Sequence, residues 1–144
     1  MDQDFVQEVK NKKRFLKRYK KHNVRLARLE EKLITLNEQI KSVRTPKLSG
    51  MPRGGVPITI EDLIADKEML EERISNMKSL RLSLKKDILK EIDTLEDVRY
   101  AEVLEMYFID CLSFDDIAEE LGYDTRHILR LYKQGIEQLV NSTK

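Results

Sequence analysis

The chain has 144 residues, of which 37% are charged, 6% are aromatic and none is tryptophan. This polar composition excludes a thick globular core and favours long solvated helices that bury a narrow apolar stripe. The sequence contains no apolar run of about 18 residues and no signal-peptide-like apolar stretch near its start, so we expect a cytoplasmic protein with no membrane partner.

The net charge of +1 conceals a strong asymmetry along the chain. Residues 1–48 have a net charge of +8, residues 49–98 one of −3 and residues 99–144 one of −4. Ten lysines and arginines, and no acidic residue, lie between Lys10 and Arg28. Such a concentrated positive segment attracts polyanions more strongly than the average charge suggests.

The first predicted helix runs from about Asp4 to Val43. Its apolar residues recur at a spacing of three and four, with His22 in one gap: Phe15, Tyr19, Leu26, Leu29, Leu33, Leu36, Ile40 and Val43. This heptad seam favours a packed coil over a single amphipathic helix, because a lone helix cannot bury the stripe. The basic residues from Lys10 to Lys21 lie beyond much of the seam and repel one another. We therefore expect them to fray unless an acidic partner or DNA is present.

Residues 45–59 contain three prolines and three glycines and are predicted to form a mobile loop. Thr59, followed by acidic residues, predicts the N-cap of a second long helix that extends to about Leu95. One heptad register gathers its apolar residues on a single seam: Ile60, Leu63, Leu70, Ile74, Met77, Leu84, Ile88 and Leu95. The apolar face broadens toward the end, so this helix should also pack against the C-terminal domain.

Two long helices joined by a loop predict an antiparallel hairpin, with an intermolecular coil as the alternative. Leu80 and Leu82 would stay uncovered on such a hairpin, so a homodimer is a further expectation. The predicted fold is all-α, with a coiled-coil arm over residues 1–95 and a helix-turn-helix domain over residues 96–144.

The C-terminal domain should begin with a helix from Asp97 to Asp110. Five apolar residues recur there at helical spacing and are expected to face inward: Val98, Ala101, Leu104, Tyr107 and Phe108. The single cysteine, Cys111, has apolar neighbours, so a buried structural thiol is expected.

The stretch from Leu112 to Leu139 has the spacing of a helix-turn-helix. Ser113 and Asp116 resemble a capping box, and Gly122 is suited to end the first helix in the left-handed conformation. Asp124 should then cap the second helix. Apolar or small residues at helical spacing predict the buried faces of both helices: Ile117, Ala118 and Leu121 in the first, Ile128, Tyr132, Gly135 and Leu139 in the second. Two helices joined by a short glycine turn are typical of DNA-binding proteins.

The outward face of the second helix is polar or basic and has no acidic residue from Thr125 to Gln134. Its candidate DNA-contacting residues are Thr125, Arg126, His127, Arg130, Lys133 and Gln134. Arginine bonds guanine bidentately and glutamine does so with adenine, and residues at the start of such a helix reach base edges. A three-helix bundle with a solvated face is the alternative, but the full spacing favours binding to double-stranded DNA.

Leu112–Leu139 resembles the last helix-turn-helix of bacterial sigma factors, the part that reads promoter DNA. The longer stretch MYFIDCLSFDDIAEELGYDTRHILRLYKQGIEQL, preceded by a helical arm and the loop TPKLSGMPRGG, is similar to small phage and prophage regulators. These are described as sigma-region-four-like, of the autolysin-regulator and late-gene-activator type. The match covers most of residues 43–140 and is strongest over 104–139.

The resemblance implies transcriptional regulation of phage or prophage genes, with RNA polymerase as a further candidate partner. It places Thr125, Arg126, His127 and Arg130 at base- or backbone-contact positions, and Lys133 and Gln134 farther along the exposed face. Gly135 stands where such helices often have alanine.

Nothing in the sequence indicates an enzyme, a cofactor or a metal site, because His22, Cys111 and His127 are far apart and lack ligand spacing. Two alternatives to a regulator stay open. One is a phage DNA-packaging protein resembling small terminase subunits, and the other is a module that binds only protein. A large ring would favour packaging, whereas a monomer or dimer would favour regulation.

Overall fold

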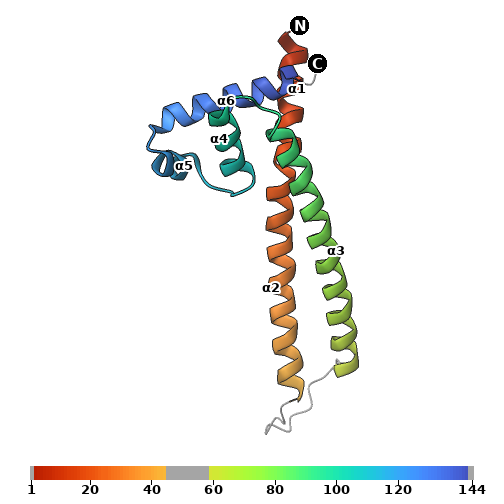
Figure 1. Ribbon diagram of the computed structural model, residues 1–144. Coiled ribbons are helices and arrows are strands. Elements are labelled where there is room, and N and C mark those ends of the chain that lie inside the picture. The colour runs from red at the N-terminus through yellow and green to blue at the C-terminus, as the bar shows by residue number, and fades with distance from the viewer. Residues whose placement is uncertain (1, 45–58, 143–144) are drawn as a thin grey trace. The chain divides into compact units, whose positions relative to one another are not determined.

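The computed structural model describes residues 2–44 and 59–142, and the regular elements within these ranges are six α-helices (Figure 1). They are α1 (Asp2–Leu16), α2 (Arg18–Arg44), α3 (Ile60–Ile92), α4 (Val98–Phe108), α5 (Phe114–Leu121) and α6 (Thr125–Ser142). The predicted all-α class is thereby confirmed. No described helix is both long and apolar enough to cross a membrane. The loop predicted over 45–59 lies, apart from Thr59, outside the described residues.

The chain divides into two compact units. Unit 1 combines the chain up to Asn23 with the chain from Arg81 onward, and unit 2 comprises Val24–Leu80. This division differs from the expected one at residues 95 and 96. The physical reason is that α1 and the end of α3 share a core with the C-terminal helices, so that burial joins segments far apart in the sequence.

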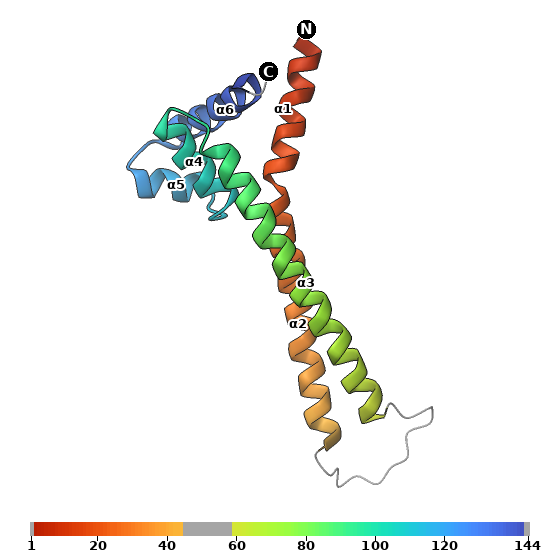
Figure 2. The same ribbon diagram turned by 45° about the vertical axis from the view of Figure 1, so that its right-hand side comes forward.

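Unit 2 is the predicted antiparallel hairpin, in which α2 and α3 lie side by side and run in opposite directions (Figure 2). Leu26 and Leu29 of α2 are buried against Leu70 and Ile74 of α3, as the heptad seams predict. The predicted cap at Thr59 is also confirmed, since its Oγ1 accepts a hydrogen bond of 3.2 Å from the backbone N–H of Asp62. At the far end of α2, Val43 is exposed, because the helix ends one residue later.

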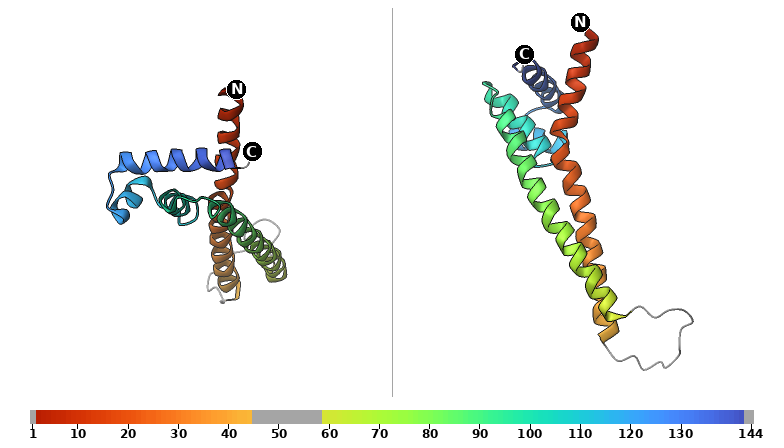
Figure 3. Two further views of the ribbon diagram at one scale, coloured as in Figure 1. Left: turned by 45° about the horizontal axis from the view of Figure 1, so that its top comes forward. Right: turned by 90° about the vertical axis from the view of Figure 1, so that its right-hand side faces the viewer.

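The main core of unit 1 forms where α1, α3, α4 and α6 meet; Figure 3 shows α6 crossing α1 in this unit. Its buried side chains are Leu16, Ile88, Ile92, Leu104, Phe108, Ile109, Ile136 and Leu139. Two of them come from the last turns of α3, where the apolar face broadens. The expectation that this helix also packs against the C-terminal domain is therefore confirmed.

The expectation that Lys10–Lys21 frays is wrong. This segment is helical, apart from a turn at Lys17 that keeps the backbone bonds from Lys17 N–H to the Lys13 carbonyl (3.0 Å) and from Lys21 N–H to the Lys17 carbonyl (3.1 Å). Leu16 is 0% exposed and lies in the unit 1 core. The segment stays helical because its apolar side chains pack against α6 and α3. The burial of these side chains outweighs the repulsion among the cations of the segment.

Two further expectations about single residues are wrong. Val98 is 74% exposed, because it is the first residue of α4 and precedes the turn of helix that meets the core. Val103 and Met106 are buried instead. Cys111 is exposed, and it takes a φ of 59° in the turn that follows α4. Its Sγ donates a 3.6 Å hydrogen bond to the Ile109 carbonyl, and its neighbours along the sequence do not bury the thiol.

Candidate nucleic-acid interface

The pair α5 and α6 is shaped by caps that the sequence encodes locally. The Ser113 side chain accepts a 3.1 Å hydrogen bond from Asp116 N–H and begins α5. Gly122 ends α5 with a φ of 72°, in the left-handed region, as predicted. The three residues Gly122–Asp124 then lead into α6, where the Asp124 carbonyl accepts backbone bonds from His127 and Ile128. Local chemistry thus fixes where α5 begins and ends, whereas the described contacts at Asp124 that begin α6 are backbone bonds.

Close packing sets how α6 crosses its neighbours. Ile117 and Ala118 of α5 are buried with Ile128 and Leu131 of α6 in a second core. Farther along α6, a Cβ built on Gly135 would lie 3.2 Å from both Leu104 Cδ1 and Tyr100 Cβ. Such contacts are tighter than ordinary van der Waals contacts, so the absence of a side chain at Gly135 allows α4 and α6 to approach closely.

An aromatic cluster holds α4, α5 and α6 together beside these cores. Tyr107 stacks on Phe114 with ring centroids 4.4 Å apart and planes 4° from parallel, and the Tyr132 ring meets both of them in T-shaped geometry. Burial raises the pKa of Tyr132 to about 12, and the neighbouring Tyr107 contributes to the rise. The phenol of the folded chain therefore releases its proton at a higher pH than an exposed tyrosine does.

Three of the six predicted contact residues form an open basic row on α6. Arg126, Arg130 and Lys133 are exposed, and their spacing of four and three residues places them on one helix face. No ion pair joins any of them to another described residue. We call these three residues the α6 stripe. Its cations are available to an external anion.

The other three predicted contact residues have partners within unit 1. Thr125 Oγ1 donates a 2.9 Å hydrogen bond to Asp115 Oδ1, which ties the start of α6 to α5. The Tyr100 hydroxyl donates to Gln134 Oε1 at 3.2 Å. His127 is half-buried, and its ring meets the Tyr123 ring edge-on at 4.8 Å. These contacts give all three residues a structural role beside any role toward a ligand.

The electrostatic surroundings limit how a polyanion can approach. Four acidic residues of α5 are exposed, and α5 has no basic residue: Asp115, Asp116, Glu119 and Glu120. Glu137, one turn beyond Lys133, ends the basic row. Because phosphates are repelled by these carboxylates, the α6 stripe offers the favourable approach and α5 does not.

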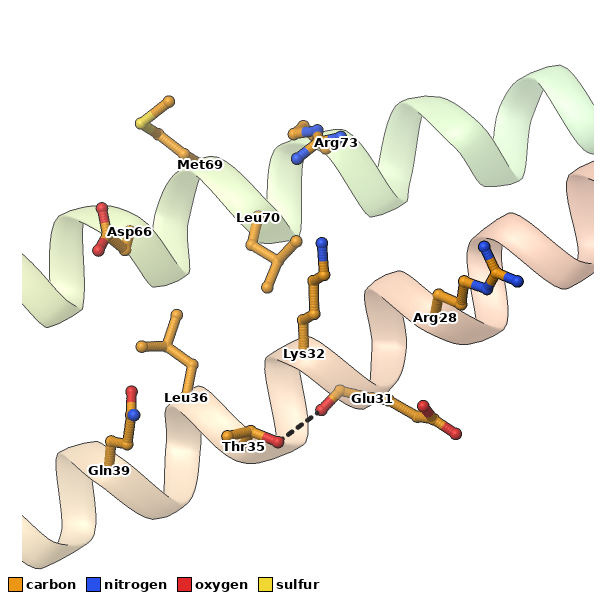
Figure 4. Close-up of a pocket in the computed structure, with 10 residues that line it drawn as sticks. All are labelled: Arg28, Glu31, Lys32, Thr35, Leu36, Gln39, Asp66, Met69, Leu70 and Arg73. Carbon is orange, nitrogen blue, oxygen red and sulfur yellow. Dashed lines mark hydrogen bonds between the residues drawn. The ribbon is translucent and has the colours of Figure 1, made fainter.

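Unit 2 has a separate surface, a groove of about 620 Å³ along one side of the hairpin (Figure 4). Leu36 and Leu70 form its apolar floor, and Met69 at its edge is 65% exposed. Asp66 lies toward one end, whereas Arg28 and Arg73 lie toward the other. Glu31 and Lys32 also line the groove, so it combines apolar surface with charges of both signs, and cations predominate toward the Arg28 and Arg73 end.

The part of the chain that the structure describes has no group of three or more His, Cys, Asp or Glu side chains that could hold a metal ion. Asp97 and Arg99 form a surface ion pair of 3.0 Å at the start of α4. The side-chain hydrogen bond from Arg99 lowers the pKa of Asp97. This pair supports the N-cap of α4, where the Asp97 side chain accepts from Arg99 N–H.

Comparison with known protein families matches most of the chain. The model of a family described as "Protein of unknown function (DUF1492)" matches residues 32–140. This range includes most of unit 2, from residue 32 onward, and the whole of α4 and α5, together with α6 as far as Val140. No curated protein and no solved structure gives a significant match.

Proposed function

This chain belongs to that family of unknown function, and we propose that it is a non-enzymatic transcription regulator whose α6 stripe binds double-stranded DNA. The observation that carries the proposal is the row of three exposed, unpaired cations on the outward face of α6. That helix follows a capped helix and a glycine turn.

The chemistry of the stripe suits a duplex. Arg126 lies at the start of α6, the part of a docking helix that reaches base edges in the major groove. Arg130 lies one turn later, and Lys133 lies one turn beyond Arg130, where such a helix meets phosphates. Because arginine offers a planar fork of donors, Arg126 and Arg130 are suited to bidentate contact with guanine.

The proposal of a regulator, rather than another DNA-binding protein, depends on the resemblance to sigma-region-four-like phage proteins over residues 104–139. RNA polymerase is then a further proposed partner. A DNA-packaging protein is the second candidate, since small terminase subunits also join coiled coils to a helix-turn-helix. A ring of many subunits would favour packaging.

We also propose that unit 2 pairs with unit 2 of a second copy through the groove of Figure 4. A two-fold axis would bring the Asp66 end of one groove to the Arg28 and Arg73 end of the other. The pairing would also cover Met69. This complementarity favours a second copy of the chain over a partner whose surface carries charges of only one sign.

Selection of bound fragments from random duplexes, followed by affinity measurement on the selected site and an unrelated duplex, tests DNA binding. Arg126→Gln and Arg130→Gln should each weaken binding to the selected site by about 1–3 kcal/mol, without changing the thermal midpoint. Arg44→Gln removes an exposed arginine from unit 2 and is the matched control. Absence of any enriched fragment, or equal losses for all three variants, would refute the α6 assignment.

A further inference from the structure

The basic residues near the start of the chain fall into two groups, according to whether their side chains contact the rest of unit 1. Between Lys10 and Lys21 there are eight lysines and arginines. Three of them take part in packing within unit 1: Lys12 pairs with Glu91, Lys13 lies 5.7 Å from the ring centroid of Tyr132, and Lys20 lies 5.4 Å from that of Tyr107. These three cations help to fix the segment on the bundle.

The remaining five basic residues are Lys10, Arg14, Lys17, Arg18 and Lys21, and all are exposed. They lie four, seven, eight and eleven residues beyond Lys10, so they share one helix face. The turn at Lys17 preserves this register, because the backbone bonds on both sides of it are kept. We call them the N-terminal stripe.

Two properties make the N-terminal stripe a preformed surface. Its five side chains form no ion pair with other described residues, and no acidic residue lies between Lys10 and Lys21. The opposite face of the same helix carries Leu16, which is fully buried with Val9, Phe15 and Tyr19 packed nearby. The cations are therefore presented by a helix whose position in unit 1 is fixed by its own core contacts.

We infer that the N-terminal stripe is a second, sequence-independent contact for the phosphate backbone of double-stranded nucleic acid. This inference uses the ligand class of the proposed function but a different set of residues. The stripe extends over about 16 Å at roughly 1.5 Å per residue, which matches several consecutive phosphates of one strand. Its side chains are donors only, so they recognise phosphate oxygens and give no discrimination among bases.

The same observations argue against a lipid surface. A helix that lies on a membrane needs an apolar face free to enter the lipid, and here the apolar face is occupied by the unit 1 core. Docked phosphates would instead displace only counterions. The two stripes would then have different roles. The α6 stripe discriminates between sequences, and the N-terminal stripe contributes affinity for any duplex.

The test compares the salt dependence of binding to a random-sequence duplex of about 30 base pairs for full-length variants. One variant replaces Lys10, Lys17 and Lys21 with glutamine. The matched control replaces Lys85, Lys86 and Lys90 of α3 in unit 1 with glutamine, which removes the same charge. Near-ultraviolet circular dichroism checks that unit 1 stays folded in both.

For the stripe variant, the slope of log affinity against log salt should become shallower by about 2–3. Its affinity at 0.1 M salt should be roughly a hundredfold weaker than that of the wild type. Its ratio of affinities for selected and unrelated duplexes should not change. The control should keep the wild-type slope. An unchanged slope in the stripe variant would overturn the inference while leaving the α6 proposal intact.

Other outcomes separate the two proposals further. If the wild type binds no duplex, both are overturned. If the Arg126 and Arg130 variants bind selected DNA as tightly as the wild type but the stripe variant does not, only the α6 proposal fails. Tighter, stripe-dependent binding to vesicles that contain phosphatidylserine than to the duplex would overturn the inference in favour of a membrane surface.

Discussion

Replacing Leu16 with alanine tests whether α1 is part of the C-terminal bundle or a separate arm. Leu16 is 0% exposed and packs among Ile88, Ile92, Leu104 and Leu139. Truncating a fully buried leucine removes its transfer free energy and leaves a cavity, which together cost about 2–5 kcal/mol. An arm that packed on nothing would give a cost near zero for the same change.

The aromatic residues provide an assay specific to unit 1. All five tyrosines lie in unit 1, at positions 19, 100, 107, 123 and 132, and the chain has no tryptophan. Tyrosine fluorescence during urea unfolding therefore reports the stability of unit 1, whereas far-ultraviolet circular dichroism reports both units. Comparing the two signals shows whether the units unfold together.

Leu16→Ala should lower the free energy of unfolding reported by tyrosine fluorescence by at least about 2 kcal/mol. Val6→Ala is the control, because Val6 lies on the same helix and is half exposed. Removal of residues 1–22 should likewise destabilise unit 1. If Leu16→Ala costs no more than Val6→Ala, α1 does not contribute to this core.

Three other predictions concern the remaining features. Gly135→Leu should destabilise unit 1 by about 1–3 kcal/mol in thermal unfolding through overpacking against Leu104 and Tyr100, whereas Gln138→Leu, on the exposed side of α6, should not. Unit 1 should lose stability as the pH rises from about 10 to 12, because the unfolded chain releases the Tyr132 proton near 10 and the folded chain near 12; a Tyr132→Phe variant whose alkaline unfolding equals that of the wild type would contradict this. Met69→Lys should shift a dimer toward monomer in sedimentation equilibrium, whereas Glu68→Lys, which does not line the groove, should not; a wild type that is monomeric at every concentration would exclude the pairing.

The proposed interface could be predicted from the sequence only in part. The exposure of Arg126, Arg130 and Lys133 follows from helical periodicity, because their spacing sets them opposite Ile128 and Gly135. The partners of Thr125 and Gln134 could not be predicted in this way. Asp115 and Tyr100 are 10 and 34 residues away from them, so only the packing of α4 and α5 against α6 brings these side chains together.

The features that depend on neighbours along the chain could be predicted from the sequence: the caps at Thr59 and Ser113, the end of α5 at Gly122 and the heptad seam of unit 2. Each results from backbone geometry or from side-chain spacing within a few turns of helix. In contrast, the packing of α1 against the C-terminal bundle, and with it the set of basic residues that contact the bundle, depends on residues far apart in the sequence. Eight cations between Lys10 and Lys21 look alike in the sequence. They become different because burial of Leu16 fixes the rotation of the helix. This rotation brings Lys12, Lys13 and Lys20 next to side chains of the bundle and leaves the other five exposed on the opposite face.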